Sequence, residues 1–337
     1  MPPKASARKK RAKDSGPTFE EIRARGAERY RIRIGFLSVL ANGELSLGEL
    51  MRWGASLGFD AISISTPVHL DPEEVIRRGP NRVADMAEKF GLRMTDLAPM
   101  VTLLAPDTAT EEKSMEFFCK NVEAAARLKV PVVKMVARPG EGMYFRGKPG
   151  RSMGHQAEGV VEAVRRFKEI YGRAVRFAEA HGVKVALETA PRGSSLASSP
   201  EMWDMLFDAV PSNSLGLAFD PSHLIWLMCG PIPPVIRRYA DRIFLVDGKD
   251  TEIYPERLQQ QGNLGNSWWA YRVPGYGQVR WEDILSTLYL CGFDGAISIE
   301  NEDPVYPGLI GVEMALRHLR RIMPPGSPGD RSSYQGH

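Results

Sequence analysis

Acidic side chains stand at the ends of apolar segments in the second half of the chain. The clearest case is residues 215–219, an apolar run of strand length followed by Asp220, Pro221 and His223. A parallel strand buried on both faces reads as a continuous apolar run, so Asp220 is expected where the strand leaves the core. Asp220 and His223 would then offer an oxygen and a nitrogen ligand to one space. Alternatively, the aspartate caps a helix and the histidine packs beside it.

Further segments of strand length end in an acid in the same way. They are residues 183–187 before Glu188, 243–246 before Asp247 and 295–299 before Glu300. In a barrel of parallel strands the carboxyl ends converge on one mouth, where such enzymes do their chemistry. The sequence therefore predicts a cluster of carboxylates there.

Like charges held together in a partly closed mouth repel one another strongly, and a divalent cation is the simplest compensation. Carboxylate and imidazole ligands together suit Mn²⁺, and also Mg²⁺, Co²⁺ or Zn²⁺. In the alternative, basic side chains neutralise the carboxylates without a metal. The candidates are Arg138, Arg192 and Lys249.

The elements that must position these residues alternate along the chain. Strand patterns are expected at 33–39, 60–65, 92–98, 130–136, 183–187, 215–219, 243–246 and 295–299. Helical patterns lie between them, and residues 251–280 are expected as a long loop. Eight strands alternating with helices, with no gap that resembles a linker, predict an α/β fold, a single (β/α)8 TIM barrel. Two doubly wound domains are the alternative.

The ends of the chain differ from the rest. Residues 1–13 hold six basic and no acidic side chains, so the formal net charge of +3 leaves about −3 on the remainder. A body that is not basic argues against a nucleic-acid-binding surface. We expect a disordered basic tail at 1–28, a barrel at 29–323 and a flexible C-terminal tail at 324–337. A nuclear or nucleic-acid patch is the alternative for the basic tail.

The composition indicates in which kind of compartment the protein works. Apolar residues make up 43% of the chain, enough for a sizeable core, and no run is long enough to suggest a membrane span. Three widely separated cysteines show no disulfide framework, which favours a reducing, cytoplasmic setting.

Several segments together resemble the xylose-isomerase-like sugar phosphate isomerase/epimerase superfamily of TIM barrels. The matching segments are residues 187–188, 196–203, 216–224, 242–253, 271–277 and 298–303, and the resemblance covers 31–322. It implies a metal held by Glu188, Asp220, Glu300 and a histidine of the seventh strand. It also implies that His223 lies beside the metal and the substrate.

The seventh strand departs from the pattern of the superfamily. The superfamily reads His-Val-His-x-Lys-Asp, whereas residues 245–250 read Leu-Val-Asp-Gly-Lys-Asp, so Asp247 stands in place of the metal-binding histidine. An aspartate binds Mn²⁺ or Mg²⁺, in a harder and more anionic site. Ala218, residues 101–104 and Asn301 also differ from the residues usual in the superfamily.

The resemblance implies a divalent-metal-dependent sugar (phosphate) isomerase or epimerase. The metal would chelate adjacent oxygens of a sugar, and a carboxylate would remove the proton beside the carbonyl. Glu188 and Glu300 are the expected acid/base pair, and each could instead be only a ligand.

Other residues are expected to contact the carbohydrate substrate. They are His223, Lys249, Arg192 and Trp268, with Trp269, Tyr276 and Arg138 as further candidates. Lys249 is expected to hold a substrate oxygen or, alternatively, to pair with Asp250. The aromatic rings would stack on a sugar; alternatively they pack within the loop or form a contact of a homo-oligomer.

Two other functions stay open beside the isomerase. One is a lyase acting on an oxidised glycoside, as in the related C-glycoside deglycosidases. The other is a diverged barrel that acts as a binding or partner subunit, which the altered seventh strand suggests. Phosphodiester cleavage, as in endonuclease IV, is disfavoured because that enzyme uses a histidine-rich cluster and this mouth has one histidine.

Overall fold

A computed structural model describes residues 32–324 of the 337-residue chain, apart from 42–43, 106, 139–152, 191–194, 264 and 266. The side chains of residues 153–158 are not described either. The predicted tail at 1–28 and all but the first residue of the predicted tail at 324–337 lie outside these ranges. So does Arg192.

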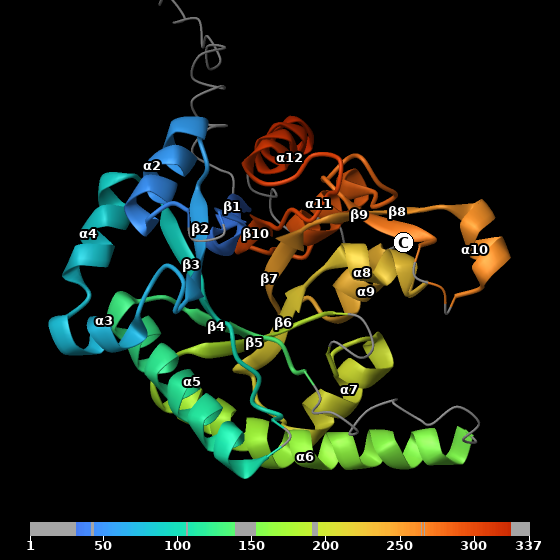
Figure 1. The fold of residues 1–337 in the computed structure, drawn as a ribbon, viewed down its shortest axis with the longest axis horizontal. Coiled ribbons are helices and arrows are strands. Elements are labelled where there is room, and N and C mark those ends of the chain that lie inside the picture. The colour runs from blue at the N-terminus through green and yellow to red at the C-terminus, as the bar shows by residue number, and fades with distance from the viewer. Residues whose placement is uncertain are drawn as a thin grey trace, which may run out of the picture.

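Eight parallel strands form a closed barrel (Figure 1). In chain order they are β1 (Arg33–Leu37), β2 (Ala61–Thr66), β3 (Arg93–Pro99), β4 (Val132–Met135), β5 (Lys184–Glu188), β6 (Leu215–Phe219), β7 (Ile243–Gly248) and β10 (Ala296–Ile299). The barrel closes where β1 pairs with β10, with Arg33 opposite Ala296. The predicted (β/α)8 barrel is confirmed.

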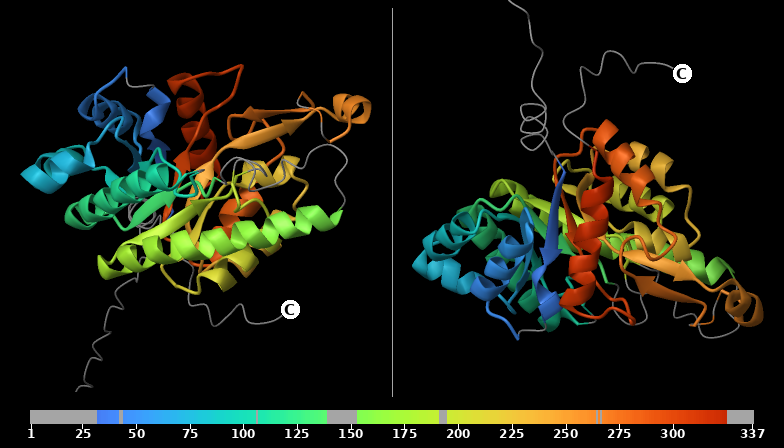
Figure 2. Two further views of the ribbon diagram at one scale, coloured as in Figure 1. Left: turned by 60° about the horizontal axis from the view of Figure 1, so that its bottom comes forward. Right: turned by 90° about the horizontal axis from the view of Figure 1, so that it is seen from above.

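Helices surround this barrel (Figure 2). They are α2 (Leu47–Leu57), α3 (Pro72–Arg78), α4 (Asn81–Lys89), α5 (Thr108–Leu128), α6 (Met153–Ala180), α7 (Pro200–Ala209), α8 (Pro221–Trp226), α9 (Ile232–Arg238), α10 (Pro255–Gln261), α11 (Trp281–Leu290) and α12 (Leu309–Ile322), with a 3₁₀ turn η1 (Ser38–Ala41). None of the helices in the described ranges is long and apolar enough to cross a membrane.

Local sequence signals explain where helices begin. Ser199 precedes α7 and its hydroxyl accepts a hydrogen bond from the backbone N–H of Met202, while Pro200 occupies the first turn, where a missing N–H costs nothing. Ser46 and Glu49 form a reciprocal capping box at the start of α2. These ends are encoded locally, so sequence patterns find them.

The region expected as a loop at 251–280 is instead partly ordered as strands. β8 (Asp250–Ile253) and β9 (Trp269–Arg272) form an antiparallel pair, with Asp250 opposite Arg272, and α10 lies between them. In Figure 1 this hairpin extends outward from the end of β7. The pair has only four residues in each strand, and the side chain of Asp250 binds backbone groups in the segment after β9, so periodicity alone does not show it.

Candidate active site at the barrel mouth

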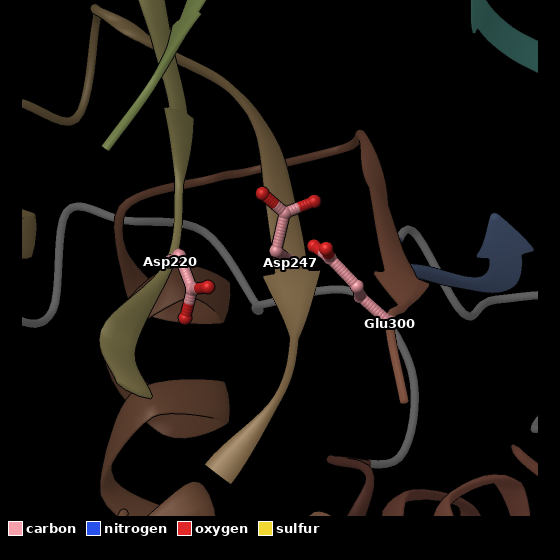
Figure 3. A group of neighbouring side chains, drawn as sticks. All are labelled: Asp220, Asp247 and Glu300. Atoms are coloured by element: carbon pink, nitrogen blue, oxygen red, sulfur yellow. The ribbon is translucent and has the colours of Figure 1, made fainter. Parts of the chain in front are cut away.

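The predicted acids come from strands that are neighbours in the barrel wall. The order β10–β7–β6–β5 is contiguous, and the four strands carry Glu300, Asp247, Asp220 and Glu188 at or just beyond their carboxyl ends. Figure 3 shows three of these side chains on adjacent strand ends, with the carboxylate of Glu300 pointing toward Asp247. The predicted convergence of the acids is therefore observed.

The pleat explains why these side chains share the barrel interior. Four apolar side chains form a small cluster inside the barrel: Val132, Ala186, Ala218 and Leu245. Two residues further along each strand the next side chain points to the same side. Those residues are Lys134, Glu188, Asp220 and Asp247. A charged layer thus lies above an apolar one, and β4 contributes a lysine to it.

Asp220 and His223 are held by the start of α8. Asp220 is the N-cap of α8, and its Oδ1 accepts a hydrogen bond from the N–H of Ser222 at 2.8 Å. His223 Nδ1 donates to the carbonyl oxygen of Thr189 at 2.5 Å, which directs Nε2 toward Asp220 Oδ2, 3.4 Å away. Asp220 therefore caps α8 through one oxygen and faces His223 with the other, and its role as a metal ligand stays a prediction.

Asp247 is paired with a lysine that the sequence analysis did not single out. Lys134 Nζ lies 2.8 Å from Asp247 Oδ1 and 2.9 Å from Oδ2. The same nitrogen is 3.3 Å from Glu188 Oε2 and 4.0 Å from Glu300 Oε2. Its side chain is only 6% exposed. The signal in the sequence was one lysine in the middle of a short apolar strand, where an unpaired charge would be very costly.

Lys249 provides a second ammonium group on the other side of the cluster. Its Nζ lies 3.3 Å from Asp220 Oδ2, 3.5 Å from Glu300 Oε1 and 3.2 Å from Glu302 Oε2. The ring of Tyr271 on β9 lies over the same ammonium, with its centroid 4.5 Å away. Hairpin and mouth are thus connected through Lys249. Asp250 is not among these partners and binds backbone groups instead.

The charges in the cluster shift the ionisation of its members. Burial alone would lower the pKa of Lys134, but the carboxylates of Asp247 and Glu188 raise it well above its usual value. Burial likewise opposes the charge on Glu300, yet Lys249 and Lys134 lower its pKa to about 2. The mouth therefore holds ammonium groups beside an ionised Glu300.

Access to solvent separates the acids into two kinds. The side chains of Glu188 and Glu300 are 17% and 15% exposed, whereas those of Asp220 and Asp247 are 0% and 2% exposed. A substrate entering the mouth therefore meets the two glutamates first. The two aspartates lie deeper, where they hold charges in place.

The donor set fits a divalent cation in kind and closeness. Asp220, Asp247 and Glu300 each offer one oxygen, all within 4.8 Å of one another. Asp220 Oδ2 and Glu300 Oε2 are buried and accept no hydrogen bond, although lysines lie within ion-pair reach. Buried oxygens without a donor are what a cation satisfies, and carboxylates suit hard divalent ions. Lys134 and Lys249 contact the same carboxylates, so their positive charges would weaken the binding of a cation.

The aromatic residues predicted to contact substrate lie on and beside the hairpin. Trp268 is 2% exposed and its ring meets that of Trp226 edge-on, with the centroids 6.4 Å apart. The ring of Trp269 stacks on that of Trp226, with the centroids 4.6 Å apart, and meets the ring of Tyr271 edge-on at 4.7 Å. Tyr276 is exposed and packs beside Tyr306. Tyr271, which contacts Lys249 and His223, is the aromatic residue nearest the cluster that the predictions omitted.

Fold and site together define a class of protein: a TIM barrel with charged residues from consecutive strands at its carboxyl-end mouth. Residues 51–322 match the xylose isomerase-like TIM barrel family, so the chain belongs to that family. The resemblance noted in the sequence is thereby confirmed.

Two relatives are similar over most of the chain. The uncharacterised protein YfiH of Bacillus subtilis is 27% identical over 312 residues, covering 83% of this chain and 96% of YfiH. Inosose isomerase of Halalkalibacterium halodurans is 24% identical over 249 residues, covering 74% of this chain and 80% of that enzyme.

Solved structures share the fold at low identity. The IOLI protein with a bound zinc atom has a TM-score of 0.66 at 20% identity, covering 86% of this chain and 96% of that one. The 3-keto-D-glucoside 4-epimerase YcjR of E. coli has a TM-score of 0.65 at 15% identity, covering 86% of this chain and 99% of that one. At these identities the likeness establishes the fold.

Proposed function

We propose that the chain is a sugar isomerase or epimerase that moves a proton beside a carbonyl group. The observation that carries this proposal is the pair of partly exposed glutamates, Glu188 and Glu300, both within 4.0 Å of the buried ammonium of Lys134. The similarity of the chain to an inosose isomerase supports the same reaction class.

The geometry supports a division of work among the residues. A carboxylate of the pair takes the proton from the carbon beside the carbonyl, which leaves negative charge on the carbonyl oxygen. The ammonium groups of Lys134 and Lys249 stabilise that charge in a site largely closed to water. In an isomerase Glu188, which now carries that proton, returns it to the neighbouring carbon. In an epimerase Glu300 delivers a proton taken up from solvent to the opposite face of the same carbon.

We propose a divalent cation, Mn²⁺ first and Mg²⁺, Co²⁺ or Zn²⁺ as alternatives, as the cofactor of this site. Asp220 and Glu300 would hold it through their oxygens that accept no hydrogen bond, with Glu188 beside them and Asp247 engaged by Lys134. When bound, such an ion polarises a carbonyl and neutralises developing negative charge. His223, fixed by Thr189 and facing Asp220, would donate or accept at a sugar hydroxyl.

The test of this proposal is exchange of a substrate proton with solvent. The full-length protein is incubated in D₂O with ketoses and inososes, with and without Mn²⁺, and deuterium incorporation is followed by mass spectrometry. We expect exchange with at least one of them, and a loss of about 10²- to 10⁴-fold in the Glu188→Gln variant because the base is gone. The control is Glu201→Gln, which changes an exposed residue of α7.

Exchange that survives unchanged in Glu188→Gln would contradict the assigned base. Product analysis separates the isomerase from the lyase, since elimination from an oxidised glycoside releases a leaving group and isomerisation does not. No exchange with any sugar would favour the diverged barrel that acts as a binding subunit.

The remaining expectations are also proposals. Arg192 and Trp268 are proposed substrate contacts, and a unit spanning 29–323 is the proposed folded domain, which limited proteolysis would delimit. A cytoplasmic setting rests on the three separated cysteines, and a homo-oligomer on the aromatic hairpin; light scattering would measure the oligomeric state.

A further inference from the structure

We propose that Lys134 is the resident cation of the mouth and competes with a divalent ion for the strand-end carboxylates. The proposal deepens the proposed function, because it concerns the charge that would stabilise the same reaction. Asp247 then serves as the main counter-ion of Lys134 and not as a ligand of a metal.

Contacts around the ammonium group are the first support. Its nitrogen lies within 2.9 Å of both oxygens of Asp247, which is hydrogen-bonding distance on both. Glu188 at 3.3 Å and Glu300 at 4.0 Å complete a set of three carboxylates around one charge. A metal bound to Asp247 would need an oxygen that already accepts a hydrogen bond from the lysine.

The barrel wall fixes where the lysine side chain goes. Lys134 lies in the middle of β4, which pairs with β3 on one side and β5 on the other. Its partner in register on β5 is Ala186, whose side chain belongs to the small apolar cluster inside the barrel. With the strand anchored on both edges, the ammonium is placed in the mouth by the fold itself.

Charge balance is the second support. The four strand-end carboxylates carry four formal negative charges, and Lys134 and Lys249 supply two positive charges among them. Each of the four acids has a lysine nitrogen within 4.0 Å. An arriving divalent ion therefore gains less than it would from four unpaired carboxylates, and it meets repulsion from an ammonium it cannot displace to water.

The replacement at position 247 is consistent with this role. A neutral imidazole on β7 would leave the ammonium of Lys134 without its closest counter-charge, whereas an aspartate supplies it. Lys134 and Asp247 are 113 residues apart in the chain and form one contact. We therefore treat the two residues as a pair, to be exchanged together.

The experiment measures Mn²⁺ binding to the full-length protein by isothermal titration calorimetry and by electron paramagnetic resonance of the free ion. Lys134→Met keeps the length of the side chain and removes its charge. We expect it to bind Mn²⁺ about 10- to 100-fold more tightly than the wild type. The double variant Lys134→Met with Asp247→His is expected to bind Mn²⁺ at least as tightly as Lys134→Met does. Asp247→His alone is expected to bind Mn²⁺ no more tightly than the wild type, because Lys134 remains. Lys113→Met, an exposed change on α5, is the matched control.

Tight stoichiometric Mn²⁺ in the wild type, with no gain in Lys134→Met, would overturn the proposal. If Lys134→Met fails to fold, a crystal structure of the wild type soaked in Mn²⁺ decides instead. An ion coordinated by Asp247, with the ammonium moved away, refutes competition; Lys134 remaining on Asp247 supports it. These outcomes are readings of metal binding, so they are independent of whether any sugar exchanges a proton.

Discussion

At the scale of single residues, two lysines lie buried among the acids of the mouth. Each ammonium contacts carboxylates from at least two different segments, so each ties strand ends together as well as supplying charge. Removing one partner from a buried ion-pair network leaves charge uncompensated, and that costs more than the net contribution of the pair.

The stability of Lys249→Met tests this argument. Asp220 and Glu300 would keep their charges in a buried place without the nearest ammonium, so we expect the free energy of unfolding to fall by about 3–5 kcal/mol. Urea denaturation followed by circular dichroism measures it. The exposed Lys113→Met should change the free energy of unfolding by less than about 0.5 kcal/mol. Equal, small effects in both variants would show that the buried network adds nothing to stability.

At the scale of elements, Asp250 organises the hairpin beside the mouth. Its Oδ2 accepts a hydrogen bond from the N–H of Gly275, and its Oδ1 accepts from those of Thr251 and Val279, each at 2.8–2.9 Å. A single carboxylate thus joins the start of β8 to the segment after β9. Gly277 has no room for a side chain there, since an added Cβ would lie 2.3 Å from Asp250 Oδ1.

Truncating this carboxylate should loosen the hairpin. Asp250→Ala leaves the N–H groups of Thr251, Gly275 and Val279 without this acceptor, two of them in buried residues, and we expect a loss of about 2–4 kcal/mol in the free energy of unfolding. Hydrogen exchange should increase at residues 273–279, while β5 and β6 keep their protection. Unchanged exchange in that segment would mean that other contacts hold it. Asp241→Asn, an exposed change, is the control.

The elements show which features a sequence reveals. Residues 215–219 are apolar throughout and their strand was predicted at its observed bounds, because burial on both faces leaves a local pattern. The hairpin was missed because its strands are short and the contacts of the Asp250 carboxylate with Gly275 and Val279 form only in the folded protein. Lys134 was missed for the same reason: its role depends on Asp247, far away in the chain. Local patterns located the acids, but the pairing of charges is a property of the folded barrel.

At the scale of the whole molecule, pairing of the first and last strands closes the barrel and fixes the layer of charge at its mouth. The closed wall keeps the cluster and the hairpin anchor away from water, so their carboxyl groups ionise differently in the folded and unfolded chains. Burial raises the pKa of Asp250 to about 6 despite its backbone hydrogen bonds, and the lysines lower that of Glu300 to about 2. The two groups therefore act on stability in opposite directions and over different ranges of pH.

The pH dependence of stability separates these two contributions. Between about pH 4 and pH 6 the folded state holds a proton on Asp250 that the unfolded state has lost, so the free energy of unfolding falls as pH rises through this window, by about 3 kcal/mol. Glu300 contributes stability above about pH 4.5 that is lost as pH falls toward 2. Thermal unfolding of the wild type and Asp250→Asn from pH 4 to pH 7 measures the first effect. The variant cannot ionise at this position, so its free energy of unfolding should rise relative to that of the wild type up to about pH 6. Above that pH the difference between the two proteins should stay constant. Parallel curves over the whole range would show that Asp250 ionises alike in the folded and unfolded states.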